Sequence, residues 1–237
     1  MDETELIPLR RDPLLPAREV PVVWRRTARA RRVSLRVDPV AGAAVVTLPR
    51  RAARARGVEL LEQHAAWVLR QIEALAPALA FAPGAAVPVG GAPHVVRHDP
   101  ARRGAEVAEG EIRVGGMAEA VPRRVERLLR AEALRRLSER ALHHAAALEV
   151  RPKAIRLKDT RTRWGSCAPD RTLSFTWRLV MAPPWVLDYV VAHEVAHLRE
   201  MNHSERFWAL CESRTPHRAA ATAWLKRHGP ALLRAGP

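Results

Sequence analysis

The sequence predicts an α+β fold, with strands gathered in the N-terminal half and long helices in the C-terminal half. Two patterns predict it: apolar residues alternate with period two in short segments before residue 116, and they recur at helical spacing in longer segments after residue 121. A chain of 237 residues can bury one substantial core, or a core with a small appendage. We therefore expect a loose arm over 1–19, a β-rich region with one long helix over 20–116, and a third region over 117–237.

The N-terminal elements follow from local pattern and turn residues. Residues 1–19 hold three prolines and no clear periodicity, so we expect them to be irregular. Alternation over 33–37 and the apolar run over 43–48 predict two strands that flank a turn. Apolar residues at helical spacing predict an amphipathic helix over 51–79.

The rest of the chain is expected to alternate between short strands and helices. Glycines and prolines punctuate 82–116, and short extended pieces there predict a small sheet from 87–89, 94–98 and 111–114. Pro184 favours the start of a helix, because the missing N–H of proline costs nothing in the first turn. We expect helices over 122–148, 184–199, 207–210 and 219–228, and strands over 155–157 and 173–177.

Composition excludes several classes of protein. The chain is 48% hydrophobic and 27% charged, and its apolar runs are too short to cross a bilayer. The acidic N-terminus lacks the apolar segment of a signal peptide. Two cysteines, Cys167 and Cys211, cannot build a disulfide framework. We therefore expect a cytoplasmic protein with reduced thiols and no membrane segment.

The formal net charge is +15, from 40 basic and 25 acidic residues. Only three of the basic residues are lysines, so coding bias contributes to this charge as well as selection. A positive field of this size attracts polyanions, which makes nucleic acid and nucleotides candidate partners. Residues 151–178 are especially basic, with eight basic and two acidic side chains, and directly precede a mildly acidic segment. The oligomeric state does not follow from these patterns.

The segment over 193–197 reads His-Glu-Val-Ala-His. On a helix, His193 and His197 lie about one turn apart on one face, so their imidazoles can bind one Zn²⁺. Glu194 is offset from His193 by roughly 100° around the helix. Its carboxylate is therefore expected beside the open metal position, where a water would bind.

A catalytic zinc site needs a third protein ligand, and His203 is the first candidate. Asn202 tolerates the left-handed conformation that ends helices, so the helix can stop there and direct His203 at the metal. Ser204 can then cap the next helix. Other divalent metals, such as Ni²⁺ or Mn²⁺, also remain candidates. The alternative third ligands are Glu200, Glu205 and Glu212.

Longer segments around this motif carry a resemblance. They are 163–167 (RWGSC), 177–180 (WRLV), 182–184 (APP), 187–204 and 206–208 (RFW), with 33–37 and 224–225 further away. Together they resemble the YgjP-like metallopeptidase family, a cytoplasmic bacterial group related to the SprT-like zincins. The resemblance implies a minimal zincin core over 117–237, built from a short sheet and the HExxH helix. It also implies a zinc site at His193, His197 and His203, with Glu194 as the catalytic residue.

Residues near the motif are candidates for substrate contacts. A cation or hydroxyl group often stabilises the developing oxyanion, and the candidates are Arg163, Arg178 and Tyr189. Gly165 indicates either a close backbone approach or a turn. Phe207 and Trp208 are expected to pack behind the site.

Three functions are consistent with this pattern. The first is a zinc-dependent hydrolase of the metallopeptidase type, in which Glu194 acts as general base on a metal-activated water. The second is a metal-dependent nucleotide phosphoanhydride hydrolase (a nucleoside triphosphate pyrophosphatase). It is favoured by basic residues that could bind phosphates: Arg156, Lys158, Arg161, Arg163 and Arg178. The third is a non-catalytic nucleic-acid-binding protein with structural zinc. Three histidines argue against the third, because structural zinc sites usually have four ligands and are rich in cysteine.

Overall fold

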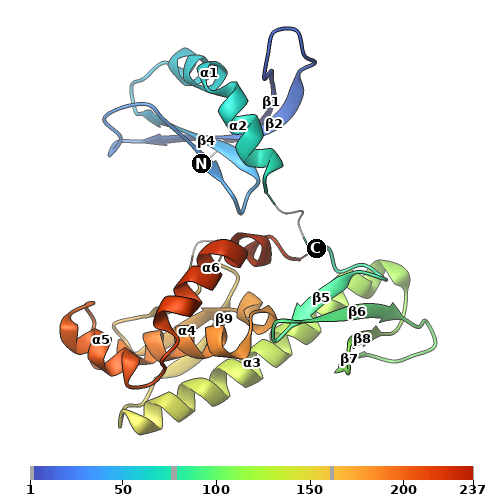
Figure 1. Ribbon diagram of the computed structural model, residues 1–237, viewed down its shortest axis with the longest axis vertical. Coiled ribbons are helices and arrows are strands. Elements are labelled where there is room, and N and C mark those ends of the chain that lie inside the picture. The colour runs from blue at the N-terminus through green and yellow to red at the C-terminus, as the bar shows by residue number, and fades with distance from the viewer. Residues whose placement is uncertain (1–2, 76–78, 161–162, 237) are drawn as a thin grey trace. The chain divides into compact units, whose positions relative to one another are not determined.

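The computed structural model describes residues 3–75, 79–160 and 163–236, and it confirms the α+β class (Figure 1). The chain divides into two compact units, Met1–Pro77 and Ala78–Pro237. Each unit has a separate cluster of buried hydrophobic residues. In the described residues, no helix is both long enough and apolar enough to span a membrane.

The first unit is a four-stranded sheet covered on one face by two helices. Its strands are β1 (Glu3–Leu9), β2 (Arg18–Thr27), β3 (Ser34–Asp38) and β4 (Ala43–Pro49), in the order β1-β2-β4-β3. Strands β2 and β4 are parallel, and the other pairs are antiparallel. Helices α1 (Arg54–Gln63) and α2 (Ala65–Glu73) bury Leu61 and Val68 against Trp24 and Val46 of the sheet.

Two expectations for this unit are wrong. The loose arm expected over 1–19 is wrong in the described part of that range, because β1 pairs with β2 along its whole length and Leu9 is buried; residues 1–2 lie outside the described residues. Pro8 is tolerated in β1 because β1 is an edge strand, where a missing N–H need not interrupt the sheet. The single helix expected over 51–79 is two helices, since His64 has the non-helical angles φ −107° and ψ 14°.

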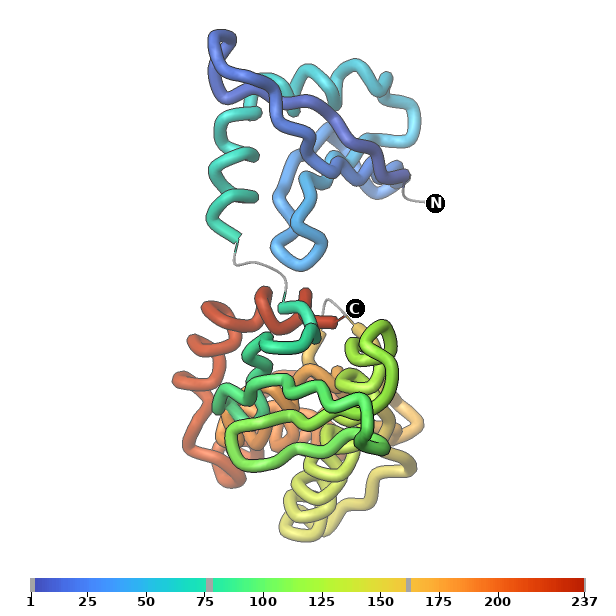
Figure 2. The backbone as a smooth tube through the Cα atoms, turned by 90° about the vertical axis from the view of Figure 1, so that its right-hand side faces the viewer, coloured from blue at the N-terminus to red at the C-terminus, as the bar shows by residue number. Residues whose placement is uncertain are grey.

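The second unit begins with a small sheet that packs on the longest helix. Strands β5 (Ala86–Val89), β6 (Ala92–His98), β7 (Ala105–Ala108) and β8 (Glu111–Val114) form the order β5-β6-β8-β7. After a short 3₁₀ turn, η1 (Ala118–Ala120), helix α3 (Val121–Ala147) packs against β7 and β8, as Figure 2 also shows.

The expected division between 116 and 117 is therefore misplaced. Val96 and Ile112 of the small sheet share one core cluster with Leu129 of α3 and with Trp177. Because these residues exclude water together, the small sheet belongs with the C-terminal helices, and the chain divides at Pro77 instead.

The remaining elements of this unit surround a second, three-stranded sheet. Strands β9 (Ala154–Lys158), β10 (Gly165–Cys167) and β11 (Thr172–Thr176) lie in the order β10-β11-β9, so β10 is an edge strand. A 3₁₀ segment, η2 (Trp177–Met181), leads into α4 (Pro184–Ala196), which packs against α3 and β10. Helices α5 (Glu205–Glu212) and α6 (Arg218–Leu233) follow.

Candidate metal centre

Helix α4 carries the His-Glu-Val-Ala-His segment through the interior of the second unit. The helix starts at Pro184, as expected, and most of its side chains are buried, including Val191 and Val195. It ends at Ala196 rather than Arg199, and His197 caps it with near-helical angles. His193 and His197 therefore keep the one-turn spacing of a helix, although the regular helix has already ended.

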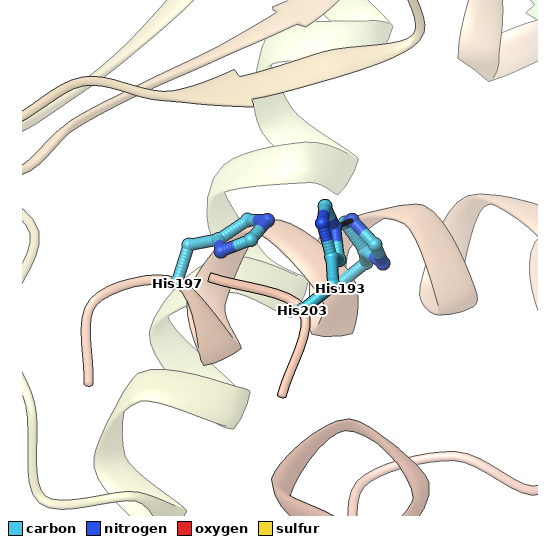
Figure 3. A group of neighbouring side chains, drawn as sticks. All are labelled: His193, His197 and His203. Atoms are coloured by element: carbon cyan, nitrogen blue, oxygen red, sulfur yellow. Dashed lines mark hydrogen bonds between the residues drawn. The ribbon is translucent and has the colours of Figure 1, made fainter. Parts of the chain in front are cut away.

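Three histidines converge near the C-terminal end of this helix. His193, His197 and His203 each offer a nitrogen, and these atoms all lie within 4.8 Å of one another (Figure 3). Nε2 of His193 is 3.1 Å from Nε2 of His203. Nitrogens bound to one tetrahedral zinc lie about 3.4 Å apart at ordinary Zn–N distances. The spacing of these nitrogens fits a shared metal ion. The carboxylates of Glu200, Glu205 and Glu212 are not part of this group in the described structure.

The surroundings of His193 and His197 favour the neutral imidazole, which is the form that binds metal. Burial, with the adjacent His197 and His203, lowers the pKa of His193 to about 4. Burial also lowers the pKa of His197, although the carbonyl of Glu200 opposes the shift. Nδ1 of His197 lies 2.9 Å from that carbonyl. If Nδ1–H donates there, Nε2 keeps its lone pair for a metal. Neutral imidazoles are the ligand form, so the donor set fits a divalent ion such as Zn²⁺.

Aromatic rings hold the histidines from behind, as expected. Phe207 stacks on His197 with ring centroids 4.4 Å apart, and Trp208 stacks on His203 at 5.4 Å. Both aromatic residues come from α5, whose first turn is capped by Ser204. The packing therefore fixes the orientation of two candidate ligands.

The turn between α4 and α5 differs from the expected one. Ser204 accepts a hydrogen bond from the Phe207 N–H at 3.3 Å, which confirms its role as a helix cap. Asn202 is not left-handed, since Glu149 and Arg171 are the non-glycine residues with positive φ in the described chain. Instead, its Oδ1 accepts from the Ser204 N–H at 3.2 Å, so a side-chain bond makes the turn.

Glu194 is buried beside this group and faces the edge strand β10. The side chain is 7% exposed, and burial raises its pKa to about 7. The backbone N–H of Cys167 and the charge of Arg163 act in the opposite direction. A carboxyl group with a pKa near neutrality can both accept and return a proton at physiological pH.

The ladder of β10 shows which of its backbone groups are free. Thr176 N–H donates to the Trp164 carbonyl at 3.0 Å, and Ala168 N–H donates to the Thr172 carbonyl at 2.9 Å. Because hydrogen-bonded pairs alternate in antiparallel strands, the backbone groups of Gly165 and Cys167 point away from β11. Glu194 interacts with the Cys167 N–H on this outer edge. The carboxylate therefore lies at the free edge of the sheet.

A pocket of about 310 Å³ adjoins Glu194 and His193. Its walls come from β10, α4 and α6, and they are mostly apolar. They include Trp164, Gly165, Tyr189, Val190, Thr222 and Leu225.

The three predicted substrate contacts have different environments. Tyr189 lines the pocket, and its ring centroid is 6.1 Å from that of His193. Arg163 is exposed and close enough to lower the pKa of Glu194. Arg178 is not available to substrate, because it is 3% exposed, pairs with Asp159 and donates to the Ala235 carbonyl at 2.9 Å. The expectation for Arg178 is therefore wrong, because Asp159 and the Ala235 carbonyl bind its guanidinium group inside the protein.

A family model described as YgjP-like, metallopeptidase domain, matches residues 31–228. The chain belongs to the YgjP-like family. Comparison with curated proteins found no significant match, and comparison with solved structures found none either. Membership of the YgjP-like family supports a metal-dependent hydrolase, and the three histidines are a group in the described structure that could hold its metal.

Sequence reasoning missed part of this YgjP-like site. The strand at Gly165–Cys167 was not expected, because three residues are too few to show a period of two. Thr222 and Leu225 of α6 also line the pocket, and no motif marks them. Gly165 was the available signal, since a glycine beside a motif suggests a close backbone approach.

Proposed function

We propose that this protein is a zinc-dependent metallopeptidase. One observation carries the proposal: the Glu194 carboxylate lies at the free edge of β10. Glu194 is also the residue that follows His193 in the sequence, and His193 belongs to the three-histidine group. The free thiols Cys167 and Cys211 are consistent with the expected cytoplasmic location.

The residues present are suited to hydrolysis. His193, His197 and His203 would hold the metal through imidazole nitrogens. A zinc ion in such a site acts as a Lewis acid and lowers the pKa of water to about 7. Glu194 accepts the proton from the attacking water and delivers it to the leaving amine, as its raised pKa permits.

The surroundings favour a peptide over a nucleotide. The outward backbone groups of Gly165 and the outward carbonyl of Cys167 can pair with an extended peptide, as sheet edges do in other peptide-binding proteins. The adjoining pocket is mostly apolar and so fits a hydrophobic side chain. A phosphate site would need several cations near Glu194, and Arg178 is already paired elsewhere. A structural zinc site would need a fourth ligand, and none joins the group in the described residues.

The proposal is tested by turnover assays on the zinc-loaded chain. We expect cleavage of casein that a chelator abolishes, and no hydrolysis of nucleoside triphosphates. Glu194→Gln should lower casein cleavage by at least about 100-fold, as expected for loss of a general base, while zinc content stays at one ion per chain. The exposed Glu205→Gln is the matched control and should keep full activity.

Two outcomes would contradict the proposal. Hydrolysis of nucleotides alone, lost in Glu194→Gln, would assign the phosphoanhydride activity instead. Zinc binding without turnover of either substrate would support the non-catalytic interpretation.

A further inference from the structure

One stretch of the first unit is strongly basic. Residues 20–58 contain ten arginines, no lysine and a single acidic residue, Asp38. This stretch therefore supplies nine of the fifteen net positive charges in about a sixth of the chain. Residues 151–178 of the second unit have a similar density of net charge, so what distinguishes 20–58 is where the fold places its arginines.

The sheet topology gathers these arginines at one end of the unit. Strands β2 and β4 are parallel, with Arg26 opposite Leu48 and Thr27 opposite Pro49, so Arg50 and Arg51 emerge beside the end of β2. Strand β3 runs the other way and starts with Ser34 opposite Thr47, which brings the loop before it to the same end. We call this end the arginine end. Its members are Arg25, Arg26, Arg29, Arg31, Arg32, Arg50 and Arg51.

Three members of the arginine end, Arg29, Arg31 and Arg32, carry charge that no described carboxylate neutralises. All members of the arginine end are exposed, and in residues 3–75, 79–160 and 163–236 no carboxylate forms an ion pair with Arg29, Arg31 or Arg32. The acidic Asp38 lies at the opposite end of β3 and pairs with Arg36 at 3.1 Å. A dense cationic surface on which several arginines have no described counter-ion favours a polyanionic ligand.

A pocket with an exposed aromatic ring adjoins this surface. It has a volume of about 540 Å³, and it lies between β3 and the two helices. Arg32 lines it together with His64 and Trp67. The Trp67 side chain is 37% exposed. Among the described residues, the other large hydrophobic side chains that are exposed are leucines and methionines. The other residues that line the pocket are Val33, Ser34, Leu35 and Leu60.

We propose that the first unit binds single-stranded nucleic acid, with phosphates on the arginine end and a base stacked on Trp67. Arginines bind phosphate oxygens through paired N–H groups, and aromatic rings stack on bases of any sequence. A base can reach a ring in a pocket only when it is unpaired, so the surface fits a single strand rather than a duplex. An acidic protein would use the arginines but would have no need for the exposed ring.

The proposal is tested on the full chain by fluorescence anisotropy with labelled 20-nucleotide oligo(dT) and oligo(U). We expect binding of at least one of them that weakens steeply between 50 and 200 mM KCl, by about a factor of 10³ if six or more phosphates are contacted. Replacing Arg29, Arg31 and Arg32 together by alanine should weaken binding at least tenfold and lower the magnitude of the salt slope by about two, because each phosphate contact on a single strand contributes about 0.7. The matched control replaces three exposed arginines of the other unit: Arg123, Arg127 and Arg227.

A second pair of variants tests the ring. Trp67→Leu keeps an apolar side chain but removes the stacking face, and it should weaken binding about 5-fold to 150-fold. Trp67→Phe should recover most of that loss. Circular dichroism of both variants shows whether the unit remains folded.

Four outcomes would overturn the proposal. The first is that neither oligonucleotide binds at 50 mM KCl, and the second is that the control arginine variant loses as much affinity as the Arg29, Arg31 and Arg32 variant. The third is that a 20-base-pair duplex binds as tightly as the single strands. The fourth is that poly-glutamate displaces the oligonucleotide completely. The last result would assign the surface to acidic proteins. If the affinities for oligo(dT) and oligo(U) differ, the tighter binder identifies DNA or RNA as the preferred ligand.

Discussion

A Cβ atom added to Gly165 would lie 2.6 Å from Cγ and 2.7 Å from Oε1 of Glu194. Gly165 is not among the glycines with positive φ, so a turn does not require it. A glycine is required at this position because the Glu194 side chain approaches its Cα so closely. Strand β10 and this carboxylate therefore fix each other's positions.

We expect Gly165→Ala to lower kcat/KM for peptide by about 100-fold, because a displacement near 1 Å of a catalytic group costs about that much. The added methyl group should also destabilise the fold by about 1–3 kcal/mol through overpacking. Zinc content should stay at one ion per chain, as measured by atomic absorption. Ser166→Ala, on the opposite face of the same strand, is the control, and comparable activity in the two variants would show that the contact is unimportant.

The metal site predicts a second result. His203→Ala should weaken zinc binding by at least about 100-fold, because loss of a direct ligand exceeds the effect of losing a partner that orients one. Competition with a chromogenic chelator measures this affinity. His143→Ala removes an exposed histidine outside the group and should bind zinc normally. Unchanged affinity in His203→Ala would mean that another residue is the third ligand.

Arg178 is predicted to act in stability rather than in substrate binding. Its guanidinium lies over Trp177 at 4.5 Å and bonds Asp159 and the Ala235 carbonyl. Arg178→Met should therefore lower the free energy of unfolding by about 2 kcal/mol, because it removes hydrogen bonds from a charged donor and leaves the Ala235 carbonyl without its partner. Urea titration measures this, and exposed Arg163→Met should change stability by less than about 0.5 kcal/mol. A normal unfolding midpoint with a raised KM would instead return Arg178 to the substrate site.

Asp188 predicts how stability depends on pH. Burial acts to raise its pKa, but hydrogen bonds from His144 and Arg140 outweigh burial and hold the pKa below its ordinary value of 3.8. The folded state therefore binds the proton less readily than the unfolded state. Its contribution to stability is present above about pH 3.8 and is lost as the pH falls through the lower folded value.

Asp188→Asn should accordingly destabilise the protein by about 2 kcal/mol at pH 7 and by clearly less at pH 3. Urea titrations at both pH values measure the difference. Glu139→Gln, at a side chain that is 68% exposed, should have little effect at either pH. An equal loss of stability at pH 7 and pH 3 for Asp188→Asn would disprove the role of its charge.

Much of the site could be predicted from sequence because its spacing is local. His193 and His197 are related by one helical turn, and Ser204 caps the next helix as expected. Arg178 could not be placed, because its partners Asp159 and Ala235 are 19 and 57 residues away in the chain. The free edge of β10 likewise depends on the pairing of three strands.

The fold shows the same limit. Helix α3 was predicted nearly to the residue, because apolar spacing over 27 residues is a strong signal. Strand β1 was missed, since only Ile7 and Leu9 of its inner face are apolar, which is too short an alternation to predict a strand. The division at Pro77 depends on which buried residues share a core, and no local pattern records that.

The two hydrophobic clusters have no residue in common. Substitutions that reshape the sheet around Trp24 can therefore accumulate over evolutionary time without disturbing the packing behind His197. Relatives of this protein are free to diversify in what their N-terminal unit captures while they retain the same hydrolytic apparatus.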